Sequence, residues 1–139
     1  MHDSDVGVGD AWRAGVLLRQ VHQRKHREID AALTPFGLSM SQYVVLLAVA
    51  ELPDASAHAV AVRTAQTDQS VGATLRTLVE TGLVDRADGM GRLYRHRLSS
   101  RGKALVQRCE EPVRAKLKEV FAPLSEAEVA QLRSLLERL

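Results

Sequence analysis

Apolar residues recur every three or four positions over most of the chain, a period that predicts a mainly helical protein. The first helix is predicted from Asp10, a residue suited to the N-cap, to about Leu33, where "TPFG" (34–37) ends it. Ser39 and Gln42 form a capping-box pattern at the start of the next helix. The run "YVVLLAVAEL" that follows predicts burial on most sides of that helix.

Two shorter helices are predicted in the middle of the chain. Ser56 can cap one that runs to about Thr64, and Thr67 or Asp68 can cap the other, which Gly82 ends. The apolar stripe of this fourth helix consists of Val71, Leu75, Leu78 and Val79.

After Gly82 the period changes from helical to alternating, which predicts strands at 83–87 and 93–98 around the turn "DGMGR" (88–92). In the second strand, Tyr94, His96 and Leu98 are expected on one face, and Leu93, Arg95 and Arg97 on the other. A long helix from about Ser99 to Glu119 follows. A capping box of Ser125 and Glu128 then starts a last helix to the C-terminus.

Four helices, a hairpin and two further helices form the layout of a winged helix-turn-helix. In that fold one helix enters the major groove of DNA and the hairpin reaches a neighbouring minor groove. The predicted fold class is therefore mainly α (α+β), and 139 residues are enough for one such domain.

The distribution of charge supports a polyanion as partner, although 19 Lys+Arg nearly balance 17 Asp+Glu. Seven basic residues stand against one acid, Asp88, between Arg86 and Arg108.

The single Cys109 excludes an internal disulfide framework, and neither a secretory signal nor a membrane-length apolar run is visible. We expect a cytoplasmic protein without a membrane partner. A nucleotide-binding glycine loop, a Ser/His/Asp set and a complete metal motif are all missing from the sequence, which argues against an enzyme and against a required cofactor.

The outward face of the fourth helix carries the first candidates for DNA contacts. Gln69 could read adenine, and Arg76 could reach guanine or a phosphate. The first turn offers short polar side chains and backbone N–H groups. The candidates of this helix are Thr67, Asp68, Gln69, Ser70, Gly72, Ala73, Arg76 and Thr77. The alternative is a merely solvated helix face.

The hairpin carries the second group. Arg92, in the turn, is expected to enter a narrow minor groove. The phosphate-contact candidates are Arg86, Arg95 and Arg97, with local pairing to Asp85 or Asp88 as the alternative. Ser41 and Gln42 could also donate to phosphate, although Gln42 serves equally well as a helix cap.

Two other features point to a sensor only weakly. His22, His26 and Asp30 share one helix face but form an incomplete metal site, so we predict no bound metal. Cys109 has no second cysteine as a resolving partner and is expected to be an inert, partly buried thiol.

Three segments resemble the MarR family of bacterial transcriptional regulators: "LTPFGLSMSQYVVLLAV", "LVETGLVDR" and "LSSRG". The resemblance implies a homodimer whose end helices (1–36 and 100–139) interlock around winged domains (37–99). It also implies a repressor that binds a pseudo-palindromic DNA operator and that a small ligand releases. The sequence departs from the family at Met90, where an Asp is usual, and at Gly72 and Ala73, where larger polar residues are usual.

The resemblance further implies an effector cleft between the first, second and fifth helices that accepts aromatic acids such as salicylate. The candidate effector residues are Arg19, Gln23, His26 and Tyr43, each of which has a purely structural role as its alternative. A winged helix that binds protein and a metal- or redox-responsive regulator remain alternative functions.

Overall fold

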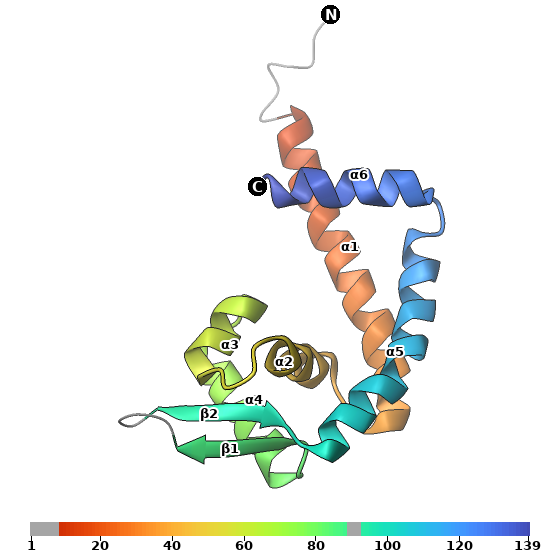
Figure 1. The fold of residues 1–139 in the computed structure, drawn as a ribbon. Helices are drawn as coiled ribbons and strands as arrows, with labels where there is room; N and C mark the ends of the chain where they lie inside the picture. The colour runs from red at the N-terminus through yellow and green to blue at the C-terminus, as the bar shows by residue number, and fades with distance from the viewer. Residues whose placement is uncertain (1–8, 89–92) are drawn as a thin grey trace, which may run out of the picture.

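The computed structural model describes residues 9–88 and 93–139. Its elements are, in chain order, α1 (Gly9–Leu33), the 3-10 turn η2 (Thr34–Phe36), α2 (Met40–Glu51), α3 (Ala57–Thr64), α4 (Asp68–Glu80), β1 (Val84–Asp88), β2 (Tyr94–Leu98), α5 (Ser100–Phe121) and α6 (Glu126–Glu137) (Figure 1). The predicted order of four helices, a hairpin and two helices is confirmed, with ends displaced by one or two residues.

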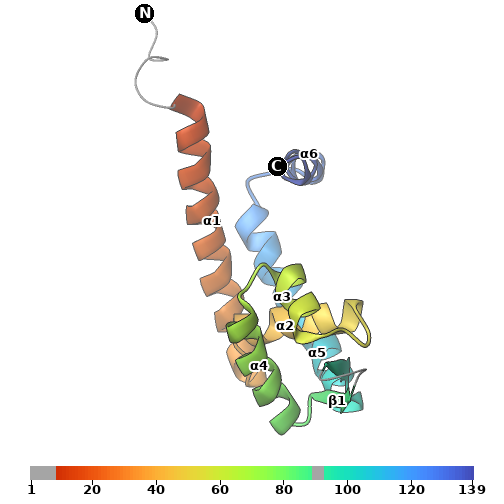
Figure 2. The same cartoon turned by 90° about the vertical axis from the view of Figure 1, so that its left-hand side faces the viewer.

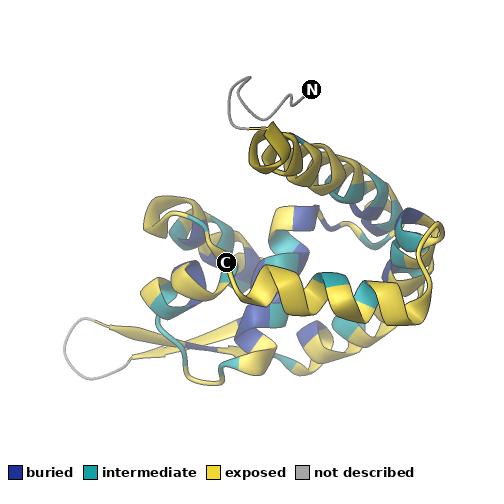
Figure 3. Ribbon diagram, turned by 90° about the horizontal axis from the view of Figure 1, so that it is seen from above, coloured by how far each residue is buried: buried dark blue, intermediate teal, exposed yellow. Residues whose placement is uncertain are grey.

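The core forms around α2, which contacts α1, α3, α4, α5 and β2. Val45 and Leu46 of α2 are fully buried, and Val49 nearly so, as the almost uninterrupted apolar run predicts. The helix starts at the predicted capping box: Ser39 Oγ accepts from the Gln42 N–H, and the Gln42 side chain accepts from the Ser39 N–H. Figure 3 shows the buried residues gathered where these elements meet, whereas α6 is exposed along most of its length.

The hairpin is antiparallel, with Val84 opposite Leu98 and Asp88 opposite Tyr94. His96 is buried, as the alternation of the second strand predicts, and Tyr94 on the same face is exposed. An isolated β-bridge joins His96 to Ala55, in the loop between α2 and α3, and the His96 Nδ1 lies 2.9 Å from the Ala55 carbonyl. This loop therefore pairs with the outer edge of β2 and links the two-stranded sheet to the helices.

The end of α4 and the start of α5 are joined through the short segment between α4 and β1. Ser99, the N-cap of α5, donates through Oγ to the Gly82 carbonyl (2.7 Å) and through its N–H to the Leu83 carbonyl (3.0 Å). Gly102 packs against this joint so closely that a Cβ there would lie 2.1 Å from the Leu83 oxygen. Arg101 also donates to the Thr81 carbonyl at the end of α4 (2.9 Å). The orientation of α4 is thus tied directly to α5.

The helices at the two ends of the chain extend away from the hairpin (Figures 1 and 2). α1 and α5 pack together where Ile29, Leu33, Cys109 and Val113 are buried. Farther along α1 and on α6, apolar side chains are exposed. They include Leu17, Leu18 and Val21 of α1, Leu135 and Leu136 of α6, and Leu139 just after α6.

No single helix of residues 9–88 and 93–139 is long and apolar enough to be a membrane span. The segments Gly9–Phe36 and Met40–Glu51 reach the length and apolar composition of a membrane span only when they are taken together, and they are bent by 82° at the break between them.

Candidate nucleic-acid interface

The predicted division of α4 into an inner and an outer face is confirmed. Val71, Leu75 and Leu78 are buried, and the outward residues Gln69, Ser70, Ala73, Arg76 and Thr77 are exposed. Because the apolar stripe anchors the helix from within, its polar side is presented to solvent as one continuous surface.

The first turn of α4 is ordered by two side chains. Thr67, the N-cap, accepts from the Ser70 N–H at 3.1 Å, so one of the two cap candidates is identified. Asp68 lies in the first turn and its Oδ1 is 2.9 Å from Nδ1 of His58 on α3. His58, which no pattern in its own neighbourhood singles out, therefore fixes a candidate DNA-contacting carboxylate at the start of α4.

Gly72 and Ala73 make the middle of the outward face shallow. A Cβ built at Gly72 would meet no atom within 4 Å, so the packing of this chain does not require a glycine there. A glycine inside a helix lowers the stability of the fold by roughly 0.5–1 kcal/mol relative to alanine. A close approach by another molecule is a physical reason for that cost.

The start of α2 contributes an exposed Ser41 and a half-buried Gln42. Of the two roles considered for Gln42, the cap is present, since its Oε1 accepts from the Ser39 N–H at 3.0 Å. Its role toward phosphate stays a prediction.

The arginines of the hairpin differ in their surroundings. The Arg86 guanidinium lies 4.3 Å from the centre of the Tyr94 ring, a cation–π contact that leaves it at the surface. Arg95 is exposed, and Arg97 pairs with Asp54 instead of the sequence-local acids Asp85 and Asp88.

The ion pair with Arg97 keeps the Asp54 carboxylate charged to a lower pH than an unpaired aspartate. The hydrogen bond from Arg97 holds the pKa of Asp54 below its usual value, and the same bond raises the pKa of Arg97. Asp54 belongs to the loop between α2 and α3 and has φ +65°, a conformation that Asp tolerates better than most residues. Arg92, the minor-groove candidate, lies outside the described residues.

A cavity of about 440 Å³ separates α4 from the hairpin. Gly72 and Arg76 line it from α4, Arg86 and Tyr94 line it from the strands, and His96 is part of its lining. Gln69 and Arg76 of α4 and Arg86 of the hairpin thus line the same cavity, whereas Arg95 and Arg97 are not part of its lining.

The comparisons with known proteins agree with this geometry. A sequence model of the MarR family matches residues 36–92. The HTH-type transcriptional repressor Rv2887 of Mycobacterium tuberculosis is 32% identical over 136 residues, which cover 96% of this chain and 98% of the relative. The chain belongs to the MarR family. As a member of that family it is a transcriptional regulator and not an enzyme.

Crystal structures of MarR-family proteins superpose on the chain. Rv2887 in complex with p-aminosalicylic acid gives a TM-score of 0.74 at 32% identity and covers 89% of this chain and 95% of that chain. Its complex with DNA gives 0.72 at 31% identity, with coverage of 89% and 94%. A MarR-family transcriptional regulator from Rhodococcus sp. RHA1 gives 0.86 at 24% identity and 94% coverage of both chains, a likeness that shows the fold alone.

The four effector candidates of this MarR-family chain are spread over different environments. Arg19 and Gln23 are exposed on α1, His26 is half-buried and Tyr43 is buried in the core. Burial, with smaller contributions from Cys109 and Glu110, raises the pKa of Tyr43. None of the four lines the cavities of about 770, 440 or 430 Å³.

The metal and thiol candidates are also placed by the structure. The His22 and His26 ring centres are 6.4 Å apart, and Asp30 Oδ1 accepts from the Met40 N–H at 2.7 Å, which commits it to the start of α2. Among the described residues, no cluster of three or more His, Cys, Asp or Glu side chains could hold a metal ion. Cys109 is fully buried and burial raises its pKa, the opposite of what a reactive thiolate needs.

Proposed function

We propose that this MarR-family protein is a ligand-responsive transcriptional repressor that binds a pseudo-palindromic operator as a homodimer. The observation that carries the proposal is the exposed polar face of α4, whose Gln69 and Arg76 line one cavity with the exposed Arg86 of the hairpin. Arg95, also on the hairpin, is exposed as well. This combination matches a helix in the major groove flanked by phosphate-contacting arginines. A winged helix that binds only protein would have less use for such a charge density, since the cores of protein interfaces are depleted in charge.

The relatives support both halves of this proposal. One is named a transcriptional repressor, and the crystal structures of Rv2887 include complexes with DNA, with salicylic acid and with p-aminosalicylic acid. We infer that the chain binds double-stranded DNA and responds to a small aromatic acid, without needing a cofactor. Such a repressor would act in the cytoplasm, where its operator lies.

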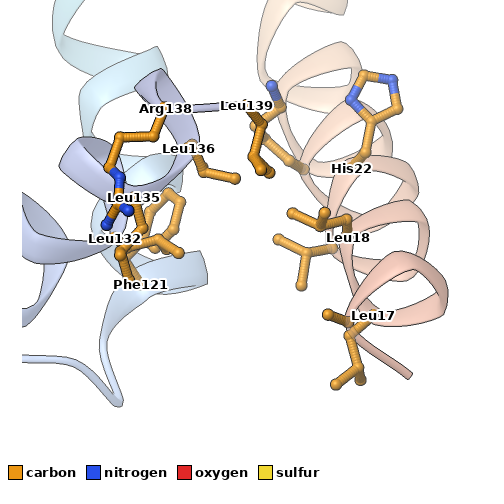
Figure 4. Close-up of a pocket in the computed structure, with 12 residues that line it drawn as sticks. Leu17, Leu18, His22, Phe121, Leu132, Leu135, Leu136, Arg138 and Leu139 are labelled. Atoms are coloured by element: carbon orange, nitrogen blue, oxygen red, sulfur yellow. The ribbon is translucent and has the colours of Figure 1, made fainter. Parts of the chain in front are cut away.

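The exposed apolar surface formed by α1, α6 and the end of α5 supports a homodimer. It surrounds a cavity of about 770 Å³ whose walls include Leu17 and Leu18 of α1, Phe121 of α5, and Leu132 and Leu136 of α6. Figure 4 shows the α6 leucines and Phe121 facing Leu17 and Leu18 across this space. An exposed apolar surface of this kind is costly in water, and a second copy of the same helices would cover it.

We infer that different segments of the chain form the dimer and bind DNA. Residues 1–36 and 100–139 of the two copies would form the dimer. Residues 37–99 of each copy would bind one half-site of the operator. Dimeric helix-turn-helix proteins place two recognition helices about 34–36 Å apart, one turn of DNA. An effector that changes this separation would weaken operator binding.

The proposal is tested by selecting operator sequences from a random duplex library with the full-length protein, then measuring affinity for the selected and for unrelated DNA. We expect Gln69→Ala to relax the preference at one base position by about 1–3 kcal/mol. Gln131→Ala, an exposed glutamine on α6, is the matched control and should bind like the wild type. If no sequence is enriched and both variants bind as the wild type does, the operator-binding function is wrong.

A further inference from the structure

A cavity of about 430 Å³ lies between the start of α2, the end of α4 and the first turns of α5, on a different side of the winged domain from the cavity beside the hairpin. Its volume falls within the roughly 300–1,000 Å³ of small-molecule sites. The DNA-contact proposal uses only one of its lining residues, Gln42, and the apolar surface proposed for the dimer uses none. Its chemistry therefore needs a separate explanation.

The lining combines two cations with apolar walls. Arg101 and Arg108 project from α5, while Phe36, Leu78 and Leu105 supply apolar surface. Among the described residues that line the cavity there is no Asp or Glu, and neither arginine forms an ion pair with a carboxylate in that part of the chain. Two guanidinium groups without a counter-charge favour an anionic ligand.

The position of Phe36 narrows the class of anion. The Arg108 guanidinium lies 5.5 Å from the centre of the Phe36 ring, so a cation and an aromatic face border the same space. A flat ligand with a ring at one end and a carboxylate at the other can contact both. Inorganic phosphate would satisfy the arginines but leave the apolar walls unused.

Arg101 also connects this cavity to the recognition helix. Its Nη1 donates to the Thr81 carbonyl at the C-cap of α4, at 2.9 Å. A carboxylate is a stronger acceptor than a neutral carbonyl, and it can take both arms of the guanidinium. A ligand in the cavity would therefore compete with the end of α4 for Arg101.

We propose that this cavity is a binding site for a small aromatic carboxylate, held by Arg101 and Arg108, and that its occupation draws Arg101 from Thr81 and so shifts α4 relative to α5. This assignment rests on the proposed function, because it names where the effector binds and how it reaches the DNA-contacting helix. Loss of the Arg101 contact would leave Ser99 as the remaining described hydrogen-bond link between α5 and the segment after α4. The site is distinct from the cleft of α1, α2 and α5 that the family resemblance implies.

The first experiment measures salicylate binding to the full-length protein without DNA, by calorimetry and by amide NMR. We expect Arg101→Gln and Arg108→Gln each to weaken binding about tenfold, equivalent to one lost charged contact. Salicylamide lacks the negative charge of salicylate. The wild type should therefore bind salicylamide no more tightly than the two arginine variants bind salicylate. The NMR signals of Gly37, which lines the cavity, and of Gly82, which lies in sequence between the lining residues Thr81 and Leu83, should shift on titration.

Three further variants make the result decisive. Ala104→Phe fills the cavity while keeping both arginines, so it should abolish binding. Arg133→Gln on α6 is the matched charge control, and Arg19→Gln tests the cleft near α1; both should bind salicylate as the wild type does. The site assignment is overturned if the wild type does not bind salicylate. It is equally overturned if Arg19→Gln abolishes binding while the cavity variants retain it.

The second experiment measures the coupling to DNA. Saturating salicylate should weaken operator binding by the wild type within the roughly 5- to 150-fold range of allosteric coupling, and Ala104→Phe should abolish this effect. Salicylate binding that leaves operator affinity unchanged would overturn the link through Arg101. Absence of operator binding before any ligand is added would instead contradict the proposed function, whereas the binding measurement without DNA would still decide the site.

Discussion

Arg97 holds the carboxylate of Asp54 in two parallel hydrogen bonds, from Nε to Oδ1 at 2.6 Å and from Nη2 to Oδ2 at 2.5 Å. The two residues are 43 positions apart, one in β2 and the other in the loop between α2 and α3. This pair lies next to the bridge between Ala55 and His96, so it fixes the loop against the hairpin at the same place. Arg97 is thereby a residue that orients the hairpin, and a phosphate would have to compete with Asp54 for its guanidinium.

Asp54→Asn tests this pair through the pH dependence of stability. Because Arg97 holds the folded-state pKa of Asp54 below the unfolded value of about 3.9, the pair stabilises the fold above that pH. The wild type should therefore be more stable than the variant near pH 7, and the difference should vanish as the pH falls through the folded pKa.

Thermal or urea unfolding from neutral to strongly acid pH measures this difference. Asn keeps a residue type that tolerates the positive φ of position 54, so the backbone is not perturbed. Arg97→Gln in the Asp54→Asn background should cause little further loss, since the partner is already gone. A difference between wild type and variant that stays constant over the whole pH range would contradict the pair.

Gly102→Ala should be strongly destabilising. A Cβ at this position would lie 2.1 Å from the Leu83 oxygen and 3.1 Å from its carbonyl carbon, which are backbone atoms that cannot turn aside. We expect a loss of about 1–3 kcal/mol or more, as for other overpacked interiors. Gly15→Ala on α1, where the new methyl group meets nothing within 4 Å, is the control and should be neutral or stabilising. Equal unfolding free energies for the two variants would show that the joint of α4 and α5 is loose.

Gly72→Ala separates folding from DNA binding. The methyl group has free space in the isolated chain and the position is inside a helix, so stability should rise by about 0.5–1 kcal/mol. If α4 approaches DNA closely at Gly72, operator affinity should fall in the same variant. Urea unfolding and operator titration on one preparation give both numbers. A variant that is more stable and binds DNA as tightly as the wild type would show that Gly72 does not face the nucleic acid.

The helix boundaries and the faces of α4 could be predicted from the sequence because their causes are local. Ser39, Ser56, Ser99 and Ser125 each accept from a backbone N–H three residues later, and such caps are visible in a short stretch of sequence. The apolar stripe of α4 likewise fixes which side is outward without any knowledge of the rest of the fold.

The contacts that position the candidate site could not be predicted in the same way. Asp54 pairs with Arg97, His58 with Asp68, and Ala55 with His96, and each partner lies 10 to 43 residues away. Nothing in the local pattern around Asp54 or His58 distinguishes it from any other polar loop or helix residue. The cavity at Arg101 and Arg108 could not be predicted for a related reason, because its walls come from η2, α2, α4 and α5 together.

Leu18→Glu tests whether the apolar surface of α1 and α6 is the dimer contact. Leu18 is 43% exposed in the isolated chain and lines the 770 Å³ cavity. A buried carboxylate without a partner is costly, so the variant should be monomeric and should lose operator affinity while keeping a folded winged domain. Val62→Glu on α3, where the side chain is 68% exposed and lies outside this surface, is the matched control. Sedimentation of both variants decides the point, and a dimeric Leu18→Glu would place the contact elsewhere.

Arg95→Ala tests the hairpin as a phosphate-contacting wing. Arg95 is exposed, and among the described residues it forms no ion pair with a carboxylate, unlike Arg97. Each phosphate contact releases counterions, so losing one per protomer should reduce the slope of log K against log salt by about 0.9 per contact. The loss should be similar for selected and unrelated sequences, because phosphates carry no sequence information. Arg133→Ala on α6 removes the same charge far from the hairpin and should leave the slope unchanged. Equal slopes for the two variants would mean that Arg95 stays in solvent when DNA is bound, and the wing would then have to act through its other arginines.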